Sequence, residues 1–222
     1  MSQASAAEER RFAGRAPHRK AVDWEYVVNA TLAFVILVFC APLIVLVALA
    51  IFVYDGGPVL FAHRRVGRHG EAFRCLKFRS MATDAEARLE RLLATDAAAR
   101  REWQADHKLR LDPRITPIGG VLRKTSLDEL PQLLNVIRGE MSLVGPRPVV
   151  QAEAQKYGRR FAHYCAVRPG ITGLWQVSGR NNVSYGRRVA LDVLYSRRKS
   201  LRLDLAILLR TVPAVLMRDG SY

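Results

Sequence analysis

The chain has 222 residues, with 35 Lys and Arg against 20 Asp and Glu, and its formal net charge is +15. Half of the residues are apolar and a quarter are charged, which excludes a disordered tail protein. Three scattered cysteines make neither a disulfide framework nor a zinc site. The charge excess implies an anionic partner, and the candidates are nucleic acid, an anionic membrane surface and a phosphorylated substrate.

A basic tail, residues 1–22, precedes an uncharged segment of 28 residues that runs from Val27 to Tyr54. This length exceeds the roughly 18 apolar residues that indicate a membrane helix. A cleaved signal peptide is a poor alternative, because its apolar region has only about 7–15 residues. As one helix the segment would be about 42 Å long, which is more than a hydrocarbon core of about 30 Å.

Pro42 lies near the middle of this segment and predicts a bend, because proline removes one helix hydrogen bond and clashes with the preceding turn. Basic residues outnumber acidic ones on both flanks of the segment, and the positive-inside rule places such flanks in the cytoplasm. Two interpretations remain open. One is a re-entrant helix over residues 23–55 that bends at Pro42 and keeps both ends on the cytoplasmic face. The other is an ordinary tilted span with a proline kink.

Residues 56–222 are expected to form a cytosolic, membrane-associated catalytic domain, so that the fold class is α+β and mainly helical. Apolar runs bounded by glycines predict short strands at 58–61 and 73–78. The pattern Thr83-x-x-Glu86 predicts a capping box at the start of a polar helix that ends at about Leu109.

A second capping box, Ser126-x-x-Glu129, predicts a helix that runs to about Arg138. The segments 144–148 and 168–173 contain Pro and Gly and are expected to be irregular. Two further helices are predicted at 185–198 and 201–217. The last one is basic and amphipathic, so it fits either the membrane interface or packing on the core.

Asp128 and Glu129 are adjacent carboxylates at a predicted helix start. One interpretation is structural, since acidic residues in a first turn cap the helix and complement its dipole. The functional interpretation uses the same position, because a helix N-terminus keeps Asp128 ionised and nucleophilic. Glu129 would then hold a Mg²⁺ ion that also binds a diphosphate.

Basic residues on the loop segments around this pair suit a phosphoryl-transfer site, because the guanidinium group of arginine can bind two phosphate oxygens at once. Each of them alone is most simply a surface charge. The residues are Lys77, Arg79, Arg123, Lys124, Arg147 and Arg168.

Several long motifs follow one another in the chain. They span residues 57–61 (GPVLF), 65–67 (RVG), 77–81 (KFRSM), 122–133 (LRKTSLDELPQL), 141–148 (MSLVGPRP) and 168–180 (RPGITGLWQVSGR). With these motifs, the sequence from about residue 27 to 222 resembles the bacterial sugar transferases, or monotopic phosphoglycosyl transferases.

The resemblance implies a re-entrant membrane helix broken at Pro42 and an Asp128–Glu129 catalytic dyad. It implies transfer of a sugar-1-phosphate from a UDP-sugar to undecaprenyl phosphate, with Mg²⁺, release of UMP and a covalent phosphosugar on Asp128. This would be the first membrane step of exopolysaccharide assembly, at the cytoplasmic face of the bacterial inner membrane, with galactose or glucose as the sugar. The phosphate-binding residues would be Lys77, Arg79, Arg123, Arg147, Arg168 and Arg180.

Two other functions were weighed against this one. A non-catalytic basic module that binds inner-membrane lipids would bind membranes without releasing UMP. A nucleic-acid binder is suggested by charge alone, and without a recognised binding motif no specific nucleic-acid partner is expected. The sequence leaves open the choice between a ping-pong and a ternary-complex mechanism, as well as homo-oligomer formation.

Overall fold

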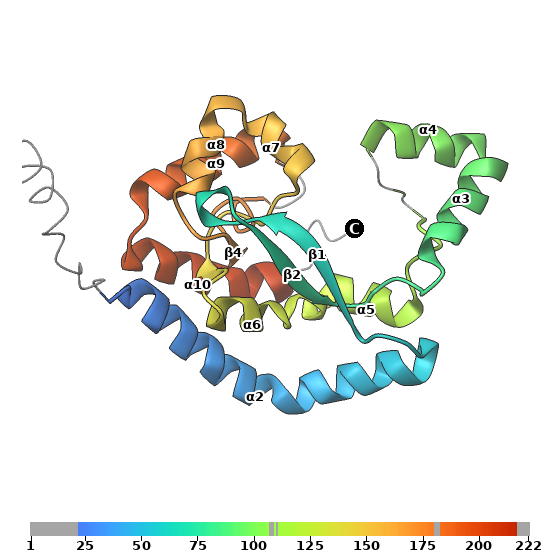
Figure 1. The fold of residues 1–222 in the computed structure, drawn as a ribbon, viewed down its shortest axis with the longest axis horizontal. Helices are drawn as coiled ribbons and strands as arrows, with labels where there is room; N and C mark the ends of the chain where they lie inside the picture. Colours follow the sequence, from blue (N-terminus) through green and yellow to red (C-terminus); the bar gives the residue numbers. More distant parts are fainter. Residues whose placement is uncertain (1–21, 107–108, 110, 180–182, 217–222) are drawn as a thin grey trace, which may run out of the picture.

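The computed structural model describes residues 22–106, 109, 111–179 and 183–216. A long bent helix lies along one side of the molecule, a β-hairpin and short helices pack on it, and a helical arm projects at one end (Figure 1). The predicted basic tail lies outside the described residues except for Val22. The described part agrees with a mainly helical fold that has a few short strands.

The long helix is α2 (Trp24–Asp55), which has 32 residues and contains Pro42. Its N-cap is Asp23, whose carboxylate accepts a hydrogen bond from the backbone N–H of Tyr26 at 3.0 Å. Figure 1 shows that α2 bends near its middle, as the proline predicts. The helix is long and apolar enough to cross a membrane, and most of its surface is not covered by protein.

The predicted strands form an antiparallel hairpin of β1 (Leu60–Val66) and β2 (Ala72–Phe78). The three-residue helix η1 (Arg68–Gly70) makes its tip, and pairing extends from Leu60↔Phe78 to Val66↔Ala72. β1 is longer than the predicted strand, because the basic residues after Phe61 continue the ladder. Phe73 and Cys75 of β2 are buried in the main core.

The polar helix predicted for Thr83 to Leu109 is divided into α3 (Ala85–Thr95) and α4 (Ala97–Asp106). Asp96 separates the two helices, because its carboxylate accepts the backbone N–H groups of Ala98 and Ala99 and thereby starts a new helix. The predicted capping box is also wrong. The N-cap is Asp84, and the backbone N–H of Thr83 donates to Asp55 at 3.2 Å instead.

The helix predicted from Ser126 to Arg138 is likewise wrong in its first half. Ser126 has φ 58° and ends α5 (Pro117–Thr125), and its side chain makes no capping hydrogen bond. The helical turn η2 (Leu127–Glu129) follows, and α6 (Gln132–Ile137) begins only after Pro131. The dyad therefore lies in a short turn between two helices and has no long helix behind it.

The parallel strands β3 (Ser142–Val144) and β4 (Gly170–Thr172) were not predicted. β4 lies within the segment 168–173, which was expected to be irregular, and β3 ends at the first residue of the segment 144–148. Their backbones approach so closely that a Cβ atom on Gly170 would lie 2.0 Å from the backbone nitrogen of Gly145. Glycine is therefore required there for steric reasons. All three residues of β3 are buried.

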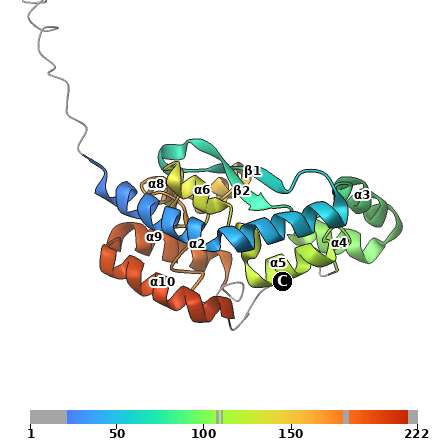
Figure 2. The same ribbon diagram turned by 90° about the horizontal axis from the view of Figure 1, so that it is seen from below.

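The rest of the described chain is helical. The helices α9 (Tyr185–Arg198) and α10 (Leu201–Leu216) confirm the two predicted C-terminal helices. Ile207 of α10 is buried in the same core cluster as Ala33 of α2, while Leu201, Leu205, Leu209 and Val212 are exposed. Figure 2, the view from below, shows α2 and α10 on the same side of the molecule. The helices η1 and α5 were not predicted, and neither were α7 (Gln151–Tyr157), η3 (Gly158–Arg160) and α8 (Phe161–Cys165).

Candidate active site

Asp128 and Glu129 lie together in η2, between α5 and α6. Asp128 is 7% exposed, and the side chain of Glu129 is 16% exposed. Two adjacent carboxylates that are largely withdrawn from water are costly unless cations compensate them. The surroundings of the dyad supply such cations from three separate segments of the chain.

Lys77 of β2 bridges the two carboxylates. Its Nζ atom lies 3.3 Å from Oδ2 of Asp128 and 2.7 Å from Oε1 of Glu129. Nη1 of Arg147 lies 3.3 Å from the same Glu129 oxygen. Glu129 therefore has two cationic partners and Asp128 has one, so the two carboxylates are held differently.

The pKa values of the two carboxyl groups shift in opposite directions. Burial raises the pKa of Asp128 above its usual value, and Lys77 only partly opposes this effect. Burial also acts on Glu129, but there the charges of Arg147 and Lys77 outweigh it and hold the pKa at about 2. Glu129 is the permanent anion of the pair, and Asp128 is the one whose charge depends on its neighbours.

Arg123 of α5 is a further cation near the dyad. Its Nε atom donates to the hydroxyl of Ser80 at 2.9 Å, and the negative charge of Asp128 favours its protonated form. Burial acts more strongly and lowers the pKa of Arg123 from its ordinary high value. Three of the predicted phosphate-binding residues thus gather at the dyad, namely Lys77, Arg123 and Arg147.

Two other predicted phosphate-binding residues hold the opposite ends of α2. Arg79 is 9% exposed, and its guanidinium binds the carboxylate of Asp55 at 3.2 Å and the carbonyl oxygen of Gly56. Arg168 binds Asp23 at 2.9 Å and the carbonyl oxygen of Gly139 at 2.9 Å. Their role in phosphate binding stays a prediction, and Arg180 lies outside the described residues.

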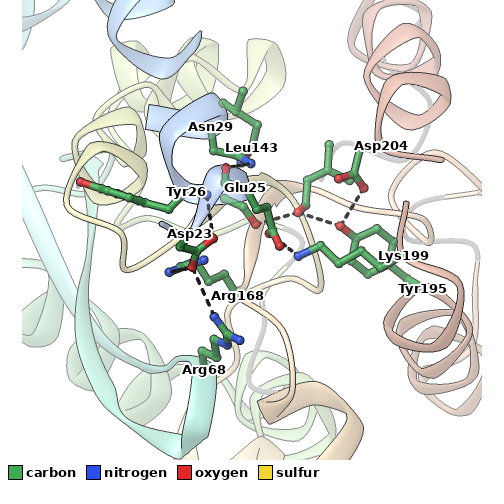
Figure 3. A network of polar contacts seen from close by, with 12 residues as sticks. Asp23, Glu25, Tyr26, Asn29, Arg68, Leu143, Arg168, Tyr195, Lys199 and Asp204 are labelled. Carbon is green, nitrogen blue, oxygen red and sulfur yellow. Dashed lines mark hydrogen bonds and ion pairs between the residues drawn. The ribbon is translucent and has the colours of Figure 1, made fainter. Parts of the chain in front are cut away.

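The contacts of Arg168 belong to a polar network that Figure 3 shows at the start of α2, which we call the anchoring cluster. Its members on α2 and the N-cap each bind a different part of the following domain. Asp23 pairs with Arg168, Glu25 with Lys199, the hydroxyl of Tyr26 with the carbonyl of Ile137, and the amide oxygen of Asn29 with the N–H of Leu143.

A magnesium site was predicted at Glu129. Within the described part of the chain, no group of three or more His, Cys, Asp or Glu residues could hold a metal ion by itself. Two adjacent carboxylates nevertheless fit Mg²⁺, which is commonly bound by one or two carboxylates together with substrate phosphates. Lys77 already places one positive charge between these carboxylates.

Sequence reasoning did not assign Arg65, although it lies in the motif of residues 65–67. Its Nη1 atom donates to the carbonyl of Pro148 at 3.4 Å, next to Arg147 in the chain. Burial lowers the pKa of Arg65, and the charge of Arg147 lowers it further. A longer predicted strand β1 would have indicated this position, because Arg65 pairs with Phe73, which lies on the same face of the hairpin as Lys77.

Comparison with known proteins agrees with these motifs. The family model described as bacterial sugar transferase matches residues 21–218. The chain belongs to the bacterial sugar transferase family. A UDP-galactose-lipid carrier transferase of Erwinia amylovora is 55% identical to it over 183 residues, which make up 81% of this chain and 38% of the relative. An undecaprenyl-phosphate galactose phosphotransferase of Salmonella typhimurium is 50% identical over 192 residues, 83% of this chain and 40% of the relative.

The chain thus spans about 40% of the length of these two family members. A third member matches along most of both sequences. It is the exopolysaccharide production protein ExoY of Sinorhizobium fredii, which is 50% identical over 194 residues, or 87% of this chain and 86% of the relative. The first two of these members are named as transferases. The dyad with its cations lies inside residues 21–218, which the family model matches.

Proposed function

We propose that the chain transfers a sugar-1-phosphate from a UDP-sugar to undecaprenyl phosphate, as the first membrane step in building an exopolysaccharide. The observation that carries the proposal is the buried Asp128–Glu129 pair, bridged by Lys77 and bound by Arg147. The names of the relatives favour galactose as the sugar, with glucose as the alternative.

Asp128 is the nucleophile in this proposal. One of its carboxylate oxygens attacks the sugar-side phosphorus, and the phosphorus–oxygen bond to the other phosphate breaks to release UMP. An oxygen of the lipid phosphate then attacks the same phosphorus. The bond between phosphorus and Asp128 breaks, which restores the carboxylate. The product is a lipid-linked sugar diphosphate.

The basic residues at the dyad have two functions in this sequence. Lys77 favours the ionised form of Asp128 against the effect of burial, which keeps the nucleophile charged. Arg147 and Arg123 present guanidinium groups to the phosphate oxygens, where such forks stabilise charge that develops during transfer. We place Mg²⁺ at Glu129, where it would neutralise diphosphate charge when bound.

We also propose that α2 is re-entrant. Its start is bound through Asp23 and its end through Asp55 to the same folded unit, on Arg168 and Arg79. Ala33, Val47 and Ile51 between these ends are buried against that unit as well. A helix of 32 residues is about 48 Å long, so a straight span would place its ends on opposite sides of a core of about 30 Å. Contacts of one domain with both ends support entry and exit at one face.

The active site would then lie at the cytoplasmic face of the inner membrane, where a soluble nucleotide sugar meets a lipid phosphate. The exposed leucines of α10 recur every four residues and form one apolar stripe, which supports insertion of this helix into the interface. The net charge of +15 would attract anionic lipids to the same surface.

The reaction is tested with purified protein in nanodiscs, Mg²⁺, undecaprenyl phosphate and a panel of labelled UDP-sugars. We expect UMP and a lipid-linked sugar diphosphate in equal amounts with one donor. The variant Asp128→Asn should lose about 10³-fold or more of this activity, because it removes the nucleophile. Transfer at the wild-type rate would exclude Asp128 as nucleophile, and a phosphosugar-labelled protein after acid quenching would distinguish ping-pong from direct transfer.

Topology is tested separately, in a background that lacks the three native cysteines. Single cysteines are introduced near residues 20 and 68 and labelled in intact cells with a reagent that does not cross the membrane. Protection of both positions is expected for the re-entrant helix. Labelling of either one from outside would establish an ordinary span.

A further inference from the structure

The side chain of Asn135 is completely buried and makes three hydrogen bonds. Its Oδ1 atom accepts from the backbone N–H of Leu76 at 3.0 Å. Its Nδ2 atom donates to the backbone carbonyl of Arg74 at 2.8 Å and to Oε2 of Glu140 at 2.6 Å. Both amide hydrogens and one acceptor site of the amide oxygen therefore take part in hydrogen bonds.

These contacts complete the outer edge of β2. Its other edge pairs with β1, and the sheet that the described residues form there has only these two strands. Arg74 and Leu76 flank Cys75 and present one carbonyl and one N–H at this outer edge. The amide of Asn135 offers them one donor and one acceptor, as the backbone of a neighbouring strand would.

The position of this contact connects the two halves of the candidate active site. Lys77 is the residue after Leu76 on β2, and Asn135 lies six residues after Glu129 on the helix that follows the dyad. Apolar packing of Leu133 and Val136 against Phe73 and Cys75 also joins these elements. Such packing is not directional, whereas hydrogen bonds fix a strand along its length.

We propose that Asn135 is a positioning residue that sets the ammonium group of Lys77 between Asp128 and Glu129. Its amide holds β2 to α6, so the distances of 3.3 and 2.7 Å from Lys77 to the dyad depend on it. Asn135 itself contacts neither substrate nor reacting atoms. The catalytic part of its test rests on the proposed function, and the geometric part does not.

The variant Asn135→Asp keeps the size and the acceptor of the side chain but removes both donor hydrogens. We expect kcat to fall by about 10²-fold, which is the scale of an error of about 1 Å in active-site geometry, while the KM for the UDP-sugar changes little. An aspartate here would place a second carboxylate against that of Glu140. In the double variant Asn135→Asp/Glu140→Gln, the glutamine amide can donate a hydrogen bond to the aspartate. This double variant should recover folding but not kcat, since the carbonyl of Arg74 stays without its donor.

Asn29→Asp is the matched control. Asn29 also accepts a backbone N–H with its amide oxygen, from Leu143 at 2.8 Å, and donates to a backbone carbonyl, that of Glu25 at 2.9 Å. The same chemical change there removes the hydrogen bond to Glu25 within α2, keeps the acceptor for Leu143 and leaves β2 in place. We expect this variant to keep its kcat even where its thermal stability falls.

The second readout does not require turnover. The folded proteins, without nucleotide, are treated at one pH with an amine-acylating reagent, and modification of Lys77 is compared with that of exposed Lys124 by mass spectrometry. Lys77 should react several-fold faster in Asn135→Asp and its double variant than in wild type, and no faster in Asn29→Asp. Equal losses of kcat in the two asparagine variants, with Lys77 unchanged, would overturn the proposal. If wild type transfers no sugar phosphate but the labelling responds as expected, the proposed function fails and the positioning role stands.

Discussion

The dyad and the anchoring cluster both pair carboxylates with basic side chains, but they hold these carboxylates in different surroundings. Asp23 remains 40% exposed and lies just before the apolar helix, where the N–H of Tyr26 and the guanidinium of Arg168 lower its pKa. Asp128 is almost completely buried, and burial raises its pKa despite Lys77. Side-chain capping, which the sequence predicts from Ser126 and Glu129, is absent at Ser126 and is made by Asp23 at the start of the long helix α2.

This difference separates the anchoring cluster from the candidate active site. In the anchoring cluster, polar side chains also bind backbone carbonyls and N–H groups, through Tyr26, Asn29 and Arg168, and these contacts fix α2 to the domain. At the dyad the partners of the carboxylates are long cationic side chains from separate segments. A buried carboxylate whose ionisation depends on one lysine is suited to chemistry, because its charge can be transferred or neutralised during a reaction.

Among the partners of these carboxylates, the largest effect is expected from Lys77→Met, which removes the cation shared by Asp128 and Glu129. The rate of transfer should fall by about 10²–10³-fold, as for the loss of one preorganised charged donor. The sign of the pH effect is also fixed. Lys77 favours the ionised form of Asp128, so its removal raises that pKa further, and the acidic limb of the kcat–pH profile should move to higher pH.

Lys156→Met is the control for this measurement, since Lys156 is exposed on α7 and is not among the basic residues named around the dyad. Its profile should match that of wild type. If Lys77→Met lowers kcat without moving the acidic limb, Lys77 does not control the ionisation of Asp128.

A smaller effect, on stability, is expected from Arg168→Met. The variant loses the pair with Asp23 and the hydrogen bond to Gly139, and each is expected to contribute about 1 kcal/mol because one partner is partly exposed. At about 2–4 °C per kcal/mol for a chain of this size, the thermal midpoint should fall by several degrees. The KM for the UDP-sugar should stay unchanged if Arg168 only anchors α2.

Arg187→Met serves as the control for a lost surface charge, because Arg187 is exposed on α9. A KM for the UDP-sugar that rises several-fold in Arg168→Met but not in Arg187→Met would show that Arg168 takes part in phosphate binding. The measurement therefore decides between the motif-based prediction and the contacts in the structure.

Sequence patterns predicted the helices that extend over many residues. The uncharged segment predicted α2, and the periodic apolar residues near the C-terminus predicted α9 and α10. The two capping boxes failed because each rests on only four residues. At Ser126, a left-handed turn lets Leu122, Leu127 and Leu130 share one apolar cluster beneath α2, and this packing outweighs the cap.

The candidate site was also predicted only in part, because its motifs are local in the sequence. Motifs indicated Asp128, Glu129 and their nearby cations, but they did not reveal which partner each cation has. Arg168 binds Asp23, which lies 145 residues away in the chain, and no short pattern contains both. The strands β3 and β4 have three residues each, too few for an alternating pattern to distinguish them from loops.

A third group of charges contains no carboxylate, and it gives the smallest expected effect. Arg64 and Arg74 lie directly opposite each other on β1 and β2, and both are exposed. Because Asn135 binds the carbonyl of Arg74 at the outer edge of β2, the two arginines exchange no backbone hydrogen bonds, and side chains of such pairs lie close together. Like charges in this arrangement are destabilising.

Arg64→Glu should therefore raise the free energy of unfolding by about 0.2–1 kcal/mol, and Arg64→Gln by less, since it removes repulsion without adding attraction. Thermal midpoints measured at low and high salt would check this order, because the gain should shrink as salt screens the pair. A lower midpoint for Arg64→Glu would mean that the like-charged pair is not what limits the stability of the hairpin.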